Sequence, residues 1–417
     1  MAVFQFSSAV FGVQEAVTSV NVTVTRAGLM TSTASVDVIS ADATAKQKGD
    51  YTFVIAHLVF GPNESQKTFQ ALISDDNYVE GTESATLLLQ NPSNATLGSP
   101  NAATLQIVDN TAETATNPID VSRTFAGQHY HDFLYRQSDL SGEDFWTNQI
   151  EQCGADAQCR QAKRVAVSSA FFLSIEFKET GYLVIRAHKA GFGSGKSTPR
   201  YPVFLRDQRE IGDGVIVGQG NWQAQLDANK QAFLQDFVSR PEFTSQASFA
   251  PGVAAGTYVD ALFANSSVTP TSSERSAAIS AYGSGNTAGR AAALKSVIES
   301  GSVFNKLYND SFVLMQYFGY LRRNPDDAPD NNFSGYDFWL AKLNSVSQAG
   351  EDMRDDTQAQ ARASRAEMIR AFIESTEYRQ RFGGSPSGNQ FAQDDGGEVA
   401  RFLKGIVRFA FFGDATG

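Results

Sequence analysis

The chain has few of the residues that mark nucleic-acid, membrane or zinc-thiolate proteins. Its 34 basic residues are outnumbered by 45 acidic ones, and the net charge of −11 argues against a nucleic-acid partner. No stretch approaches the roughly 20 apolar residues of a membrane span. Two cysteines and four histidines among 417 residues leave little material for a structural zinc site. We therefore expect neither a nucleic-acid partner nor a membrane span.

Basic residues are also missing from the first positions of the sequence. Met1-Ala2-Val3-Phe4 has no basic leader of the kind that begins a signal peptide, so we expect an export signal to have been removed or never to have existed. The Ser/Thr/Asn-rich, Lys-poor composition is nevertheless typical of extracellular protein. We predict an extracellular or cell-surface location and, from the length, two or three domains.

The two cysteines, Cys153 and Cys159, are separated by five residues. If the backbone turns between them, they can close a small disulfide loop, and an extracellular location favours this pairing. Two buried thiols are the alternative. A zinc site would need further ligands, for which only four histidines are available: His57, His129, His131 and His188.

Residues 1–110 alternate apolar and polar side chains with a period of two. Val20, Val22 and Val24 share one face, and short apolar runs follow, separated by Gly-, Pro- and Asn-rich turns: Val36–Ile39, Phe53–Phe60, Phe69–Ile73, Ala85–Leu89 and Leu105–Val108. Short, regular strands of this kind predict an antiparallel, all-β sandwich.

After residue 110 the pattern changes from strand to helix. We assign residues 111–124 to a linker and residues 125–417 to an all-α helical domain. Apolar residues recur there at helical spacing, in the sets Leu226, Phe233, Leu234, Phe237 and Met368, Ile369, Phe372, Ile373. The final apolar cluster, Phe402–Phe412, predicts a docked helix with a frayed tail.

The helical region contains a degenerate repeat, with units at about 125–245 and 300–385. The segment Tyr130-x-x-Phe133-Leu134-x-Arg136-x-x-Asp139 leads to Ser141-Gly142-Glu143-Asp144-Phe145-Trp146. The segment Tyr317-x-x-Tyr320-Leu321-x-Arg323-x-x-Asp326 leads, after six extra residues, to Ser334-Gly335-Tyr336-Asp337-Phe338-Trp339. We infer a reused helix–loop–helix unit.

Acidic residues concentrate in the β module, where ten acids face four bases and give a net charge of −6. The densest group follows one predicted strand and precedes another, in Ile73-Ser74-Asp75-Asp76-Asn77-Tyr78-Val79-Glu80-Gly81-Thr82-Glu83. Ca²⁺ takes six to eight oxygen ligands, so these acids suit it if Glu15, Asp50 and Asp109 converge on the same end. A solvated acidic turn is the alternative.

Residues 4–110 resemble a Calx-beta domain, through Phe6-Ser7-Ser8-Ala9, Val13-Gln14-Glu15, Gly49-Asp50-Tyr51, the acidic segment above and Ile107-Val108-Asp109. The resemblance implies a seven-stranded, immunoglobulin-like sandwich that binds Ca²⁺. Carried over position by position, the implied ligands are Glu15, Asp50, Asp75, Asp76, Glu80, Glu83 and Asp109. Asn110 and Thr111 replace the aspartate run of the exchanger members. We therefore predict one site of moderate affinity.

Residues 125–385 resemble an uncharacterised bacterial helical family that accompanies calcium-binding repeats in secreted proteins. In both copies of the repeat, a serine and an aspartate three residues later (Ser141/Asp144 and Ser334/Asp337) fit a capping box. The alternative is an ion held by Asp139 in the first copy and by Asp326, Asp327, Asp330 and Asn331 in the second. Trp146 and Trp339 are expected to anchor the core.

Catalytic and nucleotide-binding signals are weak. The segment Ala190–Ser197 superficially resembles a phosphate-binding loop, but a helical segment precedes it and Pro199 and Pro202 follow, which argues against the required helix. No Ser/His/Asp set has a recognisable context. We expect neither nucleotide binding nor catalysis.

These observations lead to three hypotheses. In the first, the chain is a secreted, calcium-binding structural or adhesive surface protein that self-associates into a filament or layer. In the second, it is a monomeric cell-surface module that recognises glycan or protein. In the third, it is a non-catalytic accessory region of a secreted hydrolase.

Overall fold

A computed structural model describes residues 1–110, 116–347, 351–353 and 363–383. These residues fall into two compact units. The first contains Met1–Val167 together with the described residues from Ala371 onward, and the second contains Ser168–Arg370. The predicted domain boundary at residue 110 therefore lies inside the first unit.

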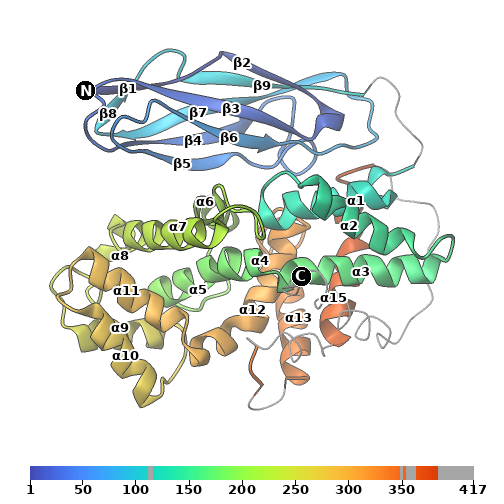
Figure 1. Cartoon of the computed structure of the whole chain (residues 1–417). Helices are drawn as coiled ribbons and strands as arrows, with labels where there is room; N and C mark the ends of the chain where they lie inside the picture. Colours follow the sequence, from blue (N-terminus) through green and yellow to red (C-terminus); the bar gives the residue numbers. More distant parts are fainter. Residues whose placement is uncertain (111–115, 348–350, 354–362, 384–417) are drawn as a thin grey trace, which may run out of the picture. The chain divides into compact units, whose positions relative to one another are not determined.

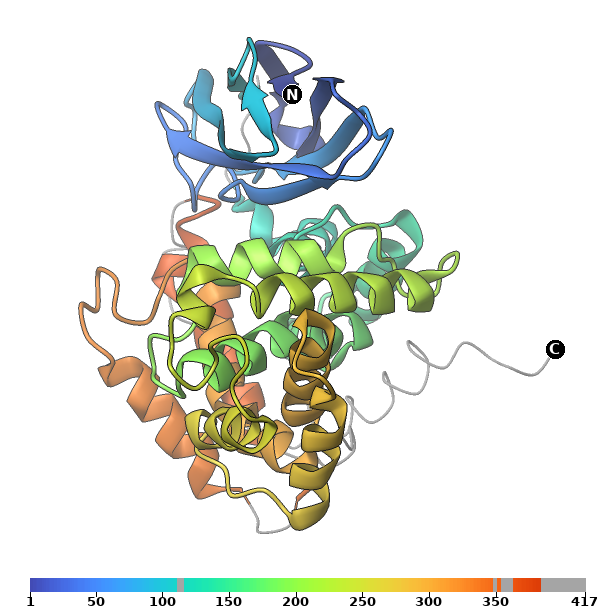
Figure 2. The same cartoon turned by 90° about the vertical axis from the view of Figure 1, so that its left-hand side faces the viewer.

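Residues 1–110 form a sandwich of two sheets, shown from two sides in Figure 1 and Figure 2. The four-stranded sheet has the order β6-β3-β1-β8, and the five-stranded sheet has the order β2-β9-β7-β4-β5. The strands are β1 (Ala2–Phe6), β2 (Val10–Gln14), β3 (Ser19–Gly28), β4 (Ala34–Asp42), β5 (Ile55–Phe60), β6 (Gln66–Leu72), β7 (Thr82–Ser93), β8 (Ala95–Leu97) and β9 (Ala102–Val108).

The alternation of apolar and polar residues in the sequence matches the alternation of buried and outward-facing side chains in the sandwich. Val22 and Val24 of β3 are fully buried, Val20 packs partly against the same core, and the intervening polar residues face outward. Large aromatic side chains, including Phe4, Phe6 and Phe60, fill the space between the sheets. The predicted all-β sandwich is confirmed.

The sandwich has nine strands in place of the seven implied by the resemblance. The first segment changes sheets after Phe6, because β1 pairs in parallel with β8 in one sheet and β2 pairs in parallel with β9 in the other. The break falls at Ser7-Ser8-Ala9, where the Ser8 hydroxyl forms a local turn with the backbone of Val10. The first expected strand is therefore divided into β1 and β2. Together with the three-residue strand β8, this raises the number of strands from seven to nine.

The helical region begins earlier than the predicted linker allows. Asn117 accepts a hydrogen bond from the Ile119 backbone and starts the 3-10 helix η2 (Pro118–Asp120), and α1 (Ser122–His129) follows. Pro118 and Ile119 are buried, so this part of 111–124 packs as structure. The assignment of residues 118–124 to a linker was wrong, because a capped, proline-initiated turn is hard to distinguish from a polar linker by composition.

Helices, joined by turns and loops, account for the other secondary-structure elements of the described chain. In the first unit they are the π-helix η3 (Tyr130–Leu134), α2 (Leu140–Glu151), the start of α3 (Ala157–Leu173) and α16 (Thr376–Arg379). Those that follow in the second unit are α4 (Ile175–Glu179), α5 (Gly181–Phe192), α6 (Tyr201–Gly212), α7 (Trp222–Phe237), α8 (Pro241–Thr244), α9 (Ala255–Asn265), α10 (Ser272–Tyr282), α11 (Thr287–Ile298), α12 (Gly301–Gly319), α13 (Ser334–Ser345) and most of α15 (Ala363–Ile373).

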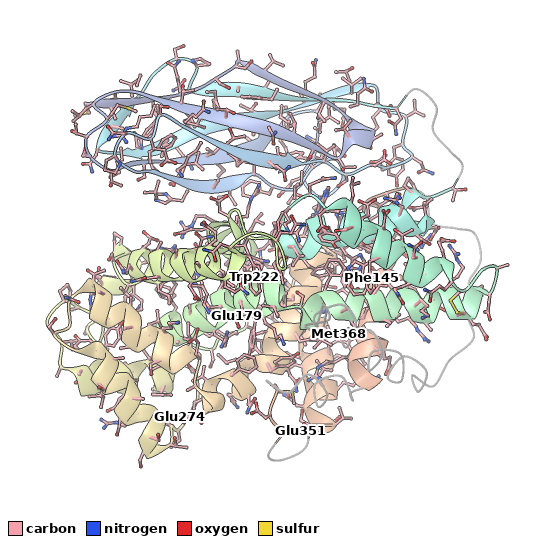
Figure 3. All side chains as sticks on the ribbon, viewed as in Figure 1. Phe145, Glu179, Trp222, Glu274, Glu351 and Met368 are labelled. Atoms are coloured by element: carbon pink, nitrogen blue, oxygen red, sulfur yellow. A yellow bond between two sulfur atoms is a disulfide. The ribbon has the colours of Figure 1, made fainter. Side chains whose placement is uncertain are left out.

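Both predicted helical periodicities are confirmed. The four residues at helical spacing in α7 are buried, and so are the four in α15. Trp222 at the start of α7 and Met368 within α15 are labelled in Figure 3. The predicted helix at Phe402–Phe412 lies outside the described residues. In the described part of the chain, none of the helices combines the length and apolar character needed to cross a membrane.

The internal repeat has matching geometry in its two copies. Tyr135 and Arg322, five residues after the first tyrosine of each copy, both adopt left-handed backbone conformations with φ of 51° and 50°. In each copy the following arginine, Arg136 or Arg323, lies over the ring of that first tyrosine, at 4.8 and 5.4 Å from its centroid. The two segments therefore share a backbone and side-chain conformation as well as a sequence pattern.

A glycine and a tyrosine meet at the same place in both copies. A Cβ atom added at Gly142 would lie 2.1 Å from the Tyr130 hydroxyl, and one added at Gly335 would lie 2.6 Å from the Tyr317 hydroxyl. The glycine is thus required because the tyrosine closes on the start of the next helix. The two tryptophans differ, since Trp146 is buried and Trp339 is half-exposed.

The capping boxes expected at Ser141/Asp144 and Ser334/Asp337 are not formed. Helix α2 is capped two residues earlier by Asp139, whose carboxylate accepts from the Gly142 backbone at 2.9 Å and from the Ser141 hydroxyl at 2.7 Å. Helix α13 follows Phe333 without a side-chain cap. The prediction was wrong because aspartate is as good a cap as serine, and Asp139 sits at the turn itself.

The predicted disulfide is present. Cys153 and Cys159 are bonded, with Cα atoms 5.6 Å apart, and the bond is visible in yellow near the first residues of α3 in Figure 3. The bridge joins the turn after α2 to α3, so it fixes how these consecutive helices meet.

Candidate metal centre

The strand register brings the ends of distant segments together at one end of the sandwich. Gln14 of β2 pairs with Val108 of β9, so the residues that follow, Glu15 and Asp109, are neighbours. Thr82 of β7 also pairs with Val108, which brings the first residues of β7, including Glu83, to the same end of the sandwich. These pairings follow from the parallel β2–β9 register and the antiparallel β7–β9 register, and could not be read from any one segment alone.

Two further loops reach the same end. Glu15 lies in the 3-10 helix η1 (Glu15–Val17). Thr18 follows this helix directly, and its carbonyl accepts a hydrogen bond from the Ile73 backbone at 2.8 Å. The Ser74 backbone donates to the Asp50 carbonyl at 2.9 Å. The acidic segment after β6 is therefore held between η1 and the loop that carries Asp50.

Asp50, Glu80 and Glu83 form one group of carboxylates. Each offers an oxygen, and the three oxygens lie within 4.8 Å of one another. Asp50 is fixed by its own loop, since its carboxylate accepts from the Lys46 backbone at 2.5 Å. Glu80 is exposed and Glu83 is half-buried, so the group opens to solvent.

Glu15, Asp75, Asp76 and Asp109 form the more deeply buried part of the cluster. Glu15 accepts a hydrogen bond from the Asp76 backbone at 2.8 Å, and Asp76 itself accepts from the Tyr78 backbone at 2.8 Å. Asp109 accepts from the backbones of Glu80 and Gly81 at 2.8 and 2.9 Å. These bonds orient the carboxylates and shape the loop around them.

Burial and mutual repulsion raise the pKa values of these carboxyls. Burial raises the pKa of Glu15 to about 9, and the negative charges of Asp76, Asp75 and Asp109 add to it. The pKa of Glu83 is raised to about 8, chiefly by burial. A hydrogen bond with Asp50 and the negative charges of Asp50, Glu80 and Asp76 contribute further. Burial also raises the pKa values of Glu80 and Asp75. The charges that act on Glu15, Glu80 and Glu83 are carboxylates throughout.

The donor set fits a hard divalent cation. All seven predicted ligand residues are carboxylates, and Ca²⁺ prefers six to eight oxygens at about 2.3–2.6 Å. Two oxygens on opposite sides of one such ion are roughly 5 Å apart, which accommodates the 4.8 Å limit on Asp50, Glu80 and Glu83. The structure brings the seven residues into one electrostatic cluster, with Asp75 also tied to Asn110 at 2.9 Å.

Sequence reasoning missed the residues that brace these loops from the helical part of the same unit. Gln137 donates to the Thr18 hydroxyl at 3.0 Å, next to η1. Arg381 donates to the Lys48 carbonyl at 3.0 Å, two residues before Asp50. Their separation in sequence, more than 300 positions for Arg381, left no local signal.

The second ion predicted as an alternative in the helical region is not supported. Arg200 pairs with Asp326 at 2.6 Å and with Asp327 at 2.9 Å, and Arg323 pairs with Asp330 at 2.8 Å. Asn331 bonds the Pro329 carbonyl. In the first copy Asp139 is the helix cap and approaches Arg136. Guanidinium groups neutralise these acids, so an ion is not needed to explain them.

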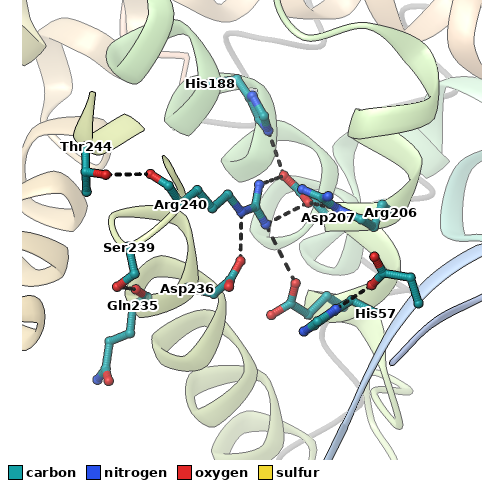
Figure 4. A network of polar contacts seen from close by, with 11 residues as sticks. His57, His188, Arg206, Asp207, Gln235, Asp236, Ser239, Arg240 and Thr244 are labelled. Carbon is teal, nitrogen blue, oxygen red and sulfur yellow. Dashed lines mark hydrogen bonds and ion pairs between the residues drawn. The ribbon is translucent and has the colours of Figure 1, made fainter. Parts of the chain in front are cut away.

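The second unit contains a buried ion network around Asp207, shown in Figure 4. The Asp207 carboxylate is fully buried and contacts His188 at 2.7 Å and both terminal nitrogens of Arg240 at 2.8 and 2.9 Å. Burial would raise the pKa of Asp207, but His188 and Arg240 together lower it below its usual range. Arg240 also pairs with Asp236, and the network ties α5, α6 and α7 to the turn before α8.

The glycine-rich segment Ala190–Ser197 joins two helices. Helix α5 precedes it, and α6 does begin at Tyr201 with Pro202 in its first turn, so the expectation that the prolines would prevent a helix was wrong. Proline is compatible with a first helical turn. Lys196 is paired with Asp337 at 2.6 Å, and no strand leads into the loop.

The Calx-beta domain family matches residues 1–111. Among solved structures, the apo-form Calx CBD1 domain is 29% identical over 26% of this chain and 97% of that chain, with a TM-score of 0.26. A CBD12 structure from CALX1.2 is 30% identical over 26% of this chain, with a TM-score of 0.25, and this chain covers 45% of it. The N-terminal sandwich is a Calx-beta domain, and a helical region follows it.

Proposed function

We propose that this chain is a calcium-binding surface protein whose Calx-beta sandwich binds one Ca²⁺ ion with moderate affinity. The observation that carries the proposal is the approach of the Asp50, Glu80 and Glu83 oxygens to within 4.8 Å of one another, beside the buried carboxylates of Glu15, Asp76 and Asp109 and the half-buried Asp75. Ionised carboxylates this close repel unless protons or a cation neutralise them, and a divalent cation can displace the protons that raised pKa values such as that of Glu83 retain. One similar structure is titled a calcium binding domain, CBD12 of CALX1.1, which agrees with this assignment.

In this proposal Asp50, Glu80 and Glu83 bind the ion directly at the open side of the cluster. Glu15, Asp75, Asp76 and Asp109 complete the oxygen shell or hold the loops in place through their backbone hydrogen bonds. The bound cation keeps the carboxylates ionised, and the protein supplies no further chemistry. Calorimetric titration of the chelator-treated chain with Ca²⁺ tests this directly, since an absence of binding heat contradicts it.

We further propose an extracellular, non-catalytic structural or adhesive role. The Cys153–Cys159 disulfide supports an oxidising location, because such bonds persist mainly outside the cytosol. Self-association into a filament or layer is the favoured form of this role. Recognition of glycan or protein by a monomer, or an accessory role beside a hydrolase, are the other forms, and the resemblance of the helical region to a bacterial family remains a prediction.

Sedimentation with and without Ca²⁺ separates these forms. A structural subunit is expected to form large particles that chelator disperses, whereas a binding module stays monomeric in both conditions. A monomer in both conditions would contradict self-assembly and leave calcium binding intact.

A further inference from the structure

One short segment of the first unit contacts two of the loops that carry the acidic cluster. The Asn77 backbone, directly after Asp76, donates to the Phe382 carbonyl at 3.1 Å. The Tyr78 hydroxyl donates to the Gln380 carbonyl at 3.2 Å. On the other loop, the Lys48 carbonyl accepts from Arg381 Nε at 3.0 Å. We call residues 378–383 the clamp segment.

The clamp segment is itself firmly anchored. The Arg381 side chain is 4% exposed, and its terminal nitrogen pairs with the fully buried Asp132 of η3 at 2.9 Å. The Tyr378 hydroxyl and the Gln128 amide bond the same carboxylate at 3.3 and 2.8 Å. A buried ion pair of this kind is costly to break. Arg381 therefore links η3 firmly to the loop that precedes Asp50.

The fit at the end of the clamp segment is tight. Gly383 has a φ of 146°, and a Cβ atom added there would lie 1.9 Å from the side-chain oxygen of Asn77. The nearest atoms to that Cβ all belong to the Asn77 side chain. A side chain at this position would displace the Asn77 side chain and would have to adopt an unfavourable positive φ, so glycine suits this close approach of the clamp segment to Asn77.

A third brace acts on η1. Gln137, in the turn between η3 and α2, bonds the Thr18 hydroxyl at 3.0 Å, and its backbone donates to Gln70 at 3.3 Å. The ring Nε2 of His131 in η3 is hydrogen-bonded to the side-chain oxygen of Gln137 at 2.9 Å. The loops bearing Glu15, Asp50 and Asp76 are thus each fastened to the helical part of the same unit.

We propose that docking of the clamp segment and binding of Ca²⁺ are thermodynamically coupled, so that each strengthens the other. The inference rests on the proposed calcium site. Docking fixes two ligand loops before the ion arrives, which removes part of the ordering cost of binding. By linkage, the ion then stabilises the docked clamp by the same factor. Calcium would in this way control how firmly the helical part of the unit holds the sandwich.

The test combines Ca²⁺ titration with hydrogen exchange on the full-length chain. We expect Ca²⁺ to slow exchange in peptides covering 375–383, and Gly383→Ala to weaken Ca²⁺ binding by about five-fold or more, the lower end of typical coupling. Adding Asn77→Ala removes the steric clash and should restore part of the affinity. Gly252→Ala is the matched control, because Gly252 also has a positive φ but open space around its Cβ and lies in the second unit.

If Gly383→Ala does not fold, Tyr78→Phe removes one clamp hydrogen bond without steric change and should weaken binding by about two-fold. Ca²⁺ binding with unchanged exchange at 375–383 and unchanged affinity in the folded clamp variants would overturn the coupling while the calcium site stands. An absence of Ca²⁺ binding by the unaltered chain would overturn the site and the coupling together.

Discussion

The carboxylate of Glu15 accepts a hydrogen bond from the backbone N–H of Asp76 at 2.8 Å, while the Asp76 side chain adds its own negative charge beside it. Backbone geometry thus pulls the two residues together although their side chains repel. Glu15 is only 5% exposed and Asp76 only 2%. In the ion-free chain Glu15 and Glu83 relieve the repulsion within the cluster by holding protons at neutral pH, and the following predictions depend on this.

Replacing Glu15 by glutamine is expected to have opposite effects with and without calcium. Gln retains the acceptor for the Asp76 backbone and, unlike the Glu15 carboxyl, needs no proton to be neutral in the folded chain at pH 7. The ion-free chain should therefore gain at least about 1 kcal/mol in free energy of unfolding, the order of one pKa unit. Ca²⁺ binding should weaken by about ten-fold, since affinity follows ligand charge. Thermal unfolding in chelator and calorimetric titration measure the two effects.

Glu64→Gln is the control for that substitution. Glu64 pairs with Lys67 at 2.9 Å in a partly exposed ion pair at the turn that leads into β6. Its replacement should change stability by less than about 1 kcal/mol and leave Ca²⁺ affinity unaltered. Equal effects of the two substitutions on Ca²⁺ binding would contradict the placement of Glu15 in the site.

Calcium binding should release protons at neutral pH. The pKa values of Glu15 and Glu83, about 9 and about 8, mean that both carboxyls hold protons in the ion-free chain at pH 7, and a cation displaces them. Up to about two protons should leave per ion, and affinity should rise between pH 7 and 9. Titration in buffers of different ionisation enthalpy measures the release, and a heat independent of buffer would contradict it.

The same carboxyls give the ion-free chain a defined pH dependence of stability. Their folded pKa values lie above the ordinary value of 4.5, so the folded chain holds protons that the unfolded chain has already lost. The contribution of these groups to the free energy of unfolding is complete below pH 4.5 and is lost as the pH rises through 8 and 9. Saturating Ca²⁺ should flatten this decline, as melting in chelator and in calcium will show.

The repeated glycine–tyrosine contact can be tested in both copies. Gly142→Ala and Gly335→Ala should each destabilise the chain by about 1–3 kcal/mol, because the new methyl group meets the hydroxyl of Tyr130 or Tyr317. Adding Tyr130→Phe or Tyr317→Phe removes the clashing oxygen and should recover most of the loss.

Gly212→Ala at the end of α6 serves as the control, since nothing lies within 4 Å of its added Cβ. Denaturant unfolding provides the measurement. If the phenylalanine substitutions recover nothing, the contact is not what requires glycine.

Much of the fold could be predicted because its signals are local. The period-two burial of β3 and the helical spacing of α7 are written into consecutive residues, and the resemblance of 1–110 to a Calx-beta domain supplied the seven acids. The predictions of the α2 cap and of the linker were wrong because residues with similar preferences compete for these positions. Asp139 caps α2 in place of Ser141, and Pro118 starts a turn where a linker was expected.

The clamp segment could not be predicted, for a different reason. Arg381 reaches Lys48 and Asp132 only after the chain has folded, and nothing around residue 381 indicates an acidic loop more than 300 positions away. The helical region was therefore assigned to a domain of its own, whereas part of it packs with the sandwich.

The most direct test of the calcium site is calorimetric titration of the full-length, chelator-treated chain with Ca²⁺, compared with an Asp50→Asn/Glu83→Gln variant. We predict one ion per chain with a dissociation constant between about 1 µM and 1 mM, and at least a ten-fold loss in the variant. A flat titration of the unaltered chain, with a melting temperature that chelator does not change, would contradict the account.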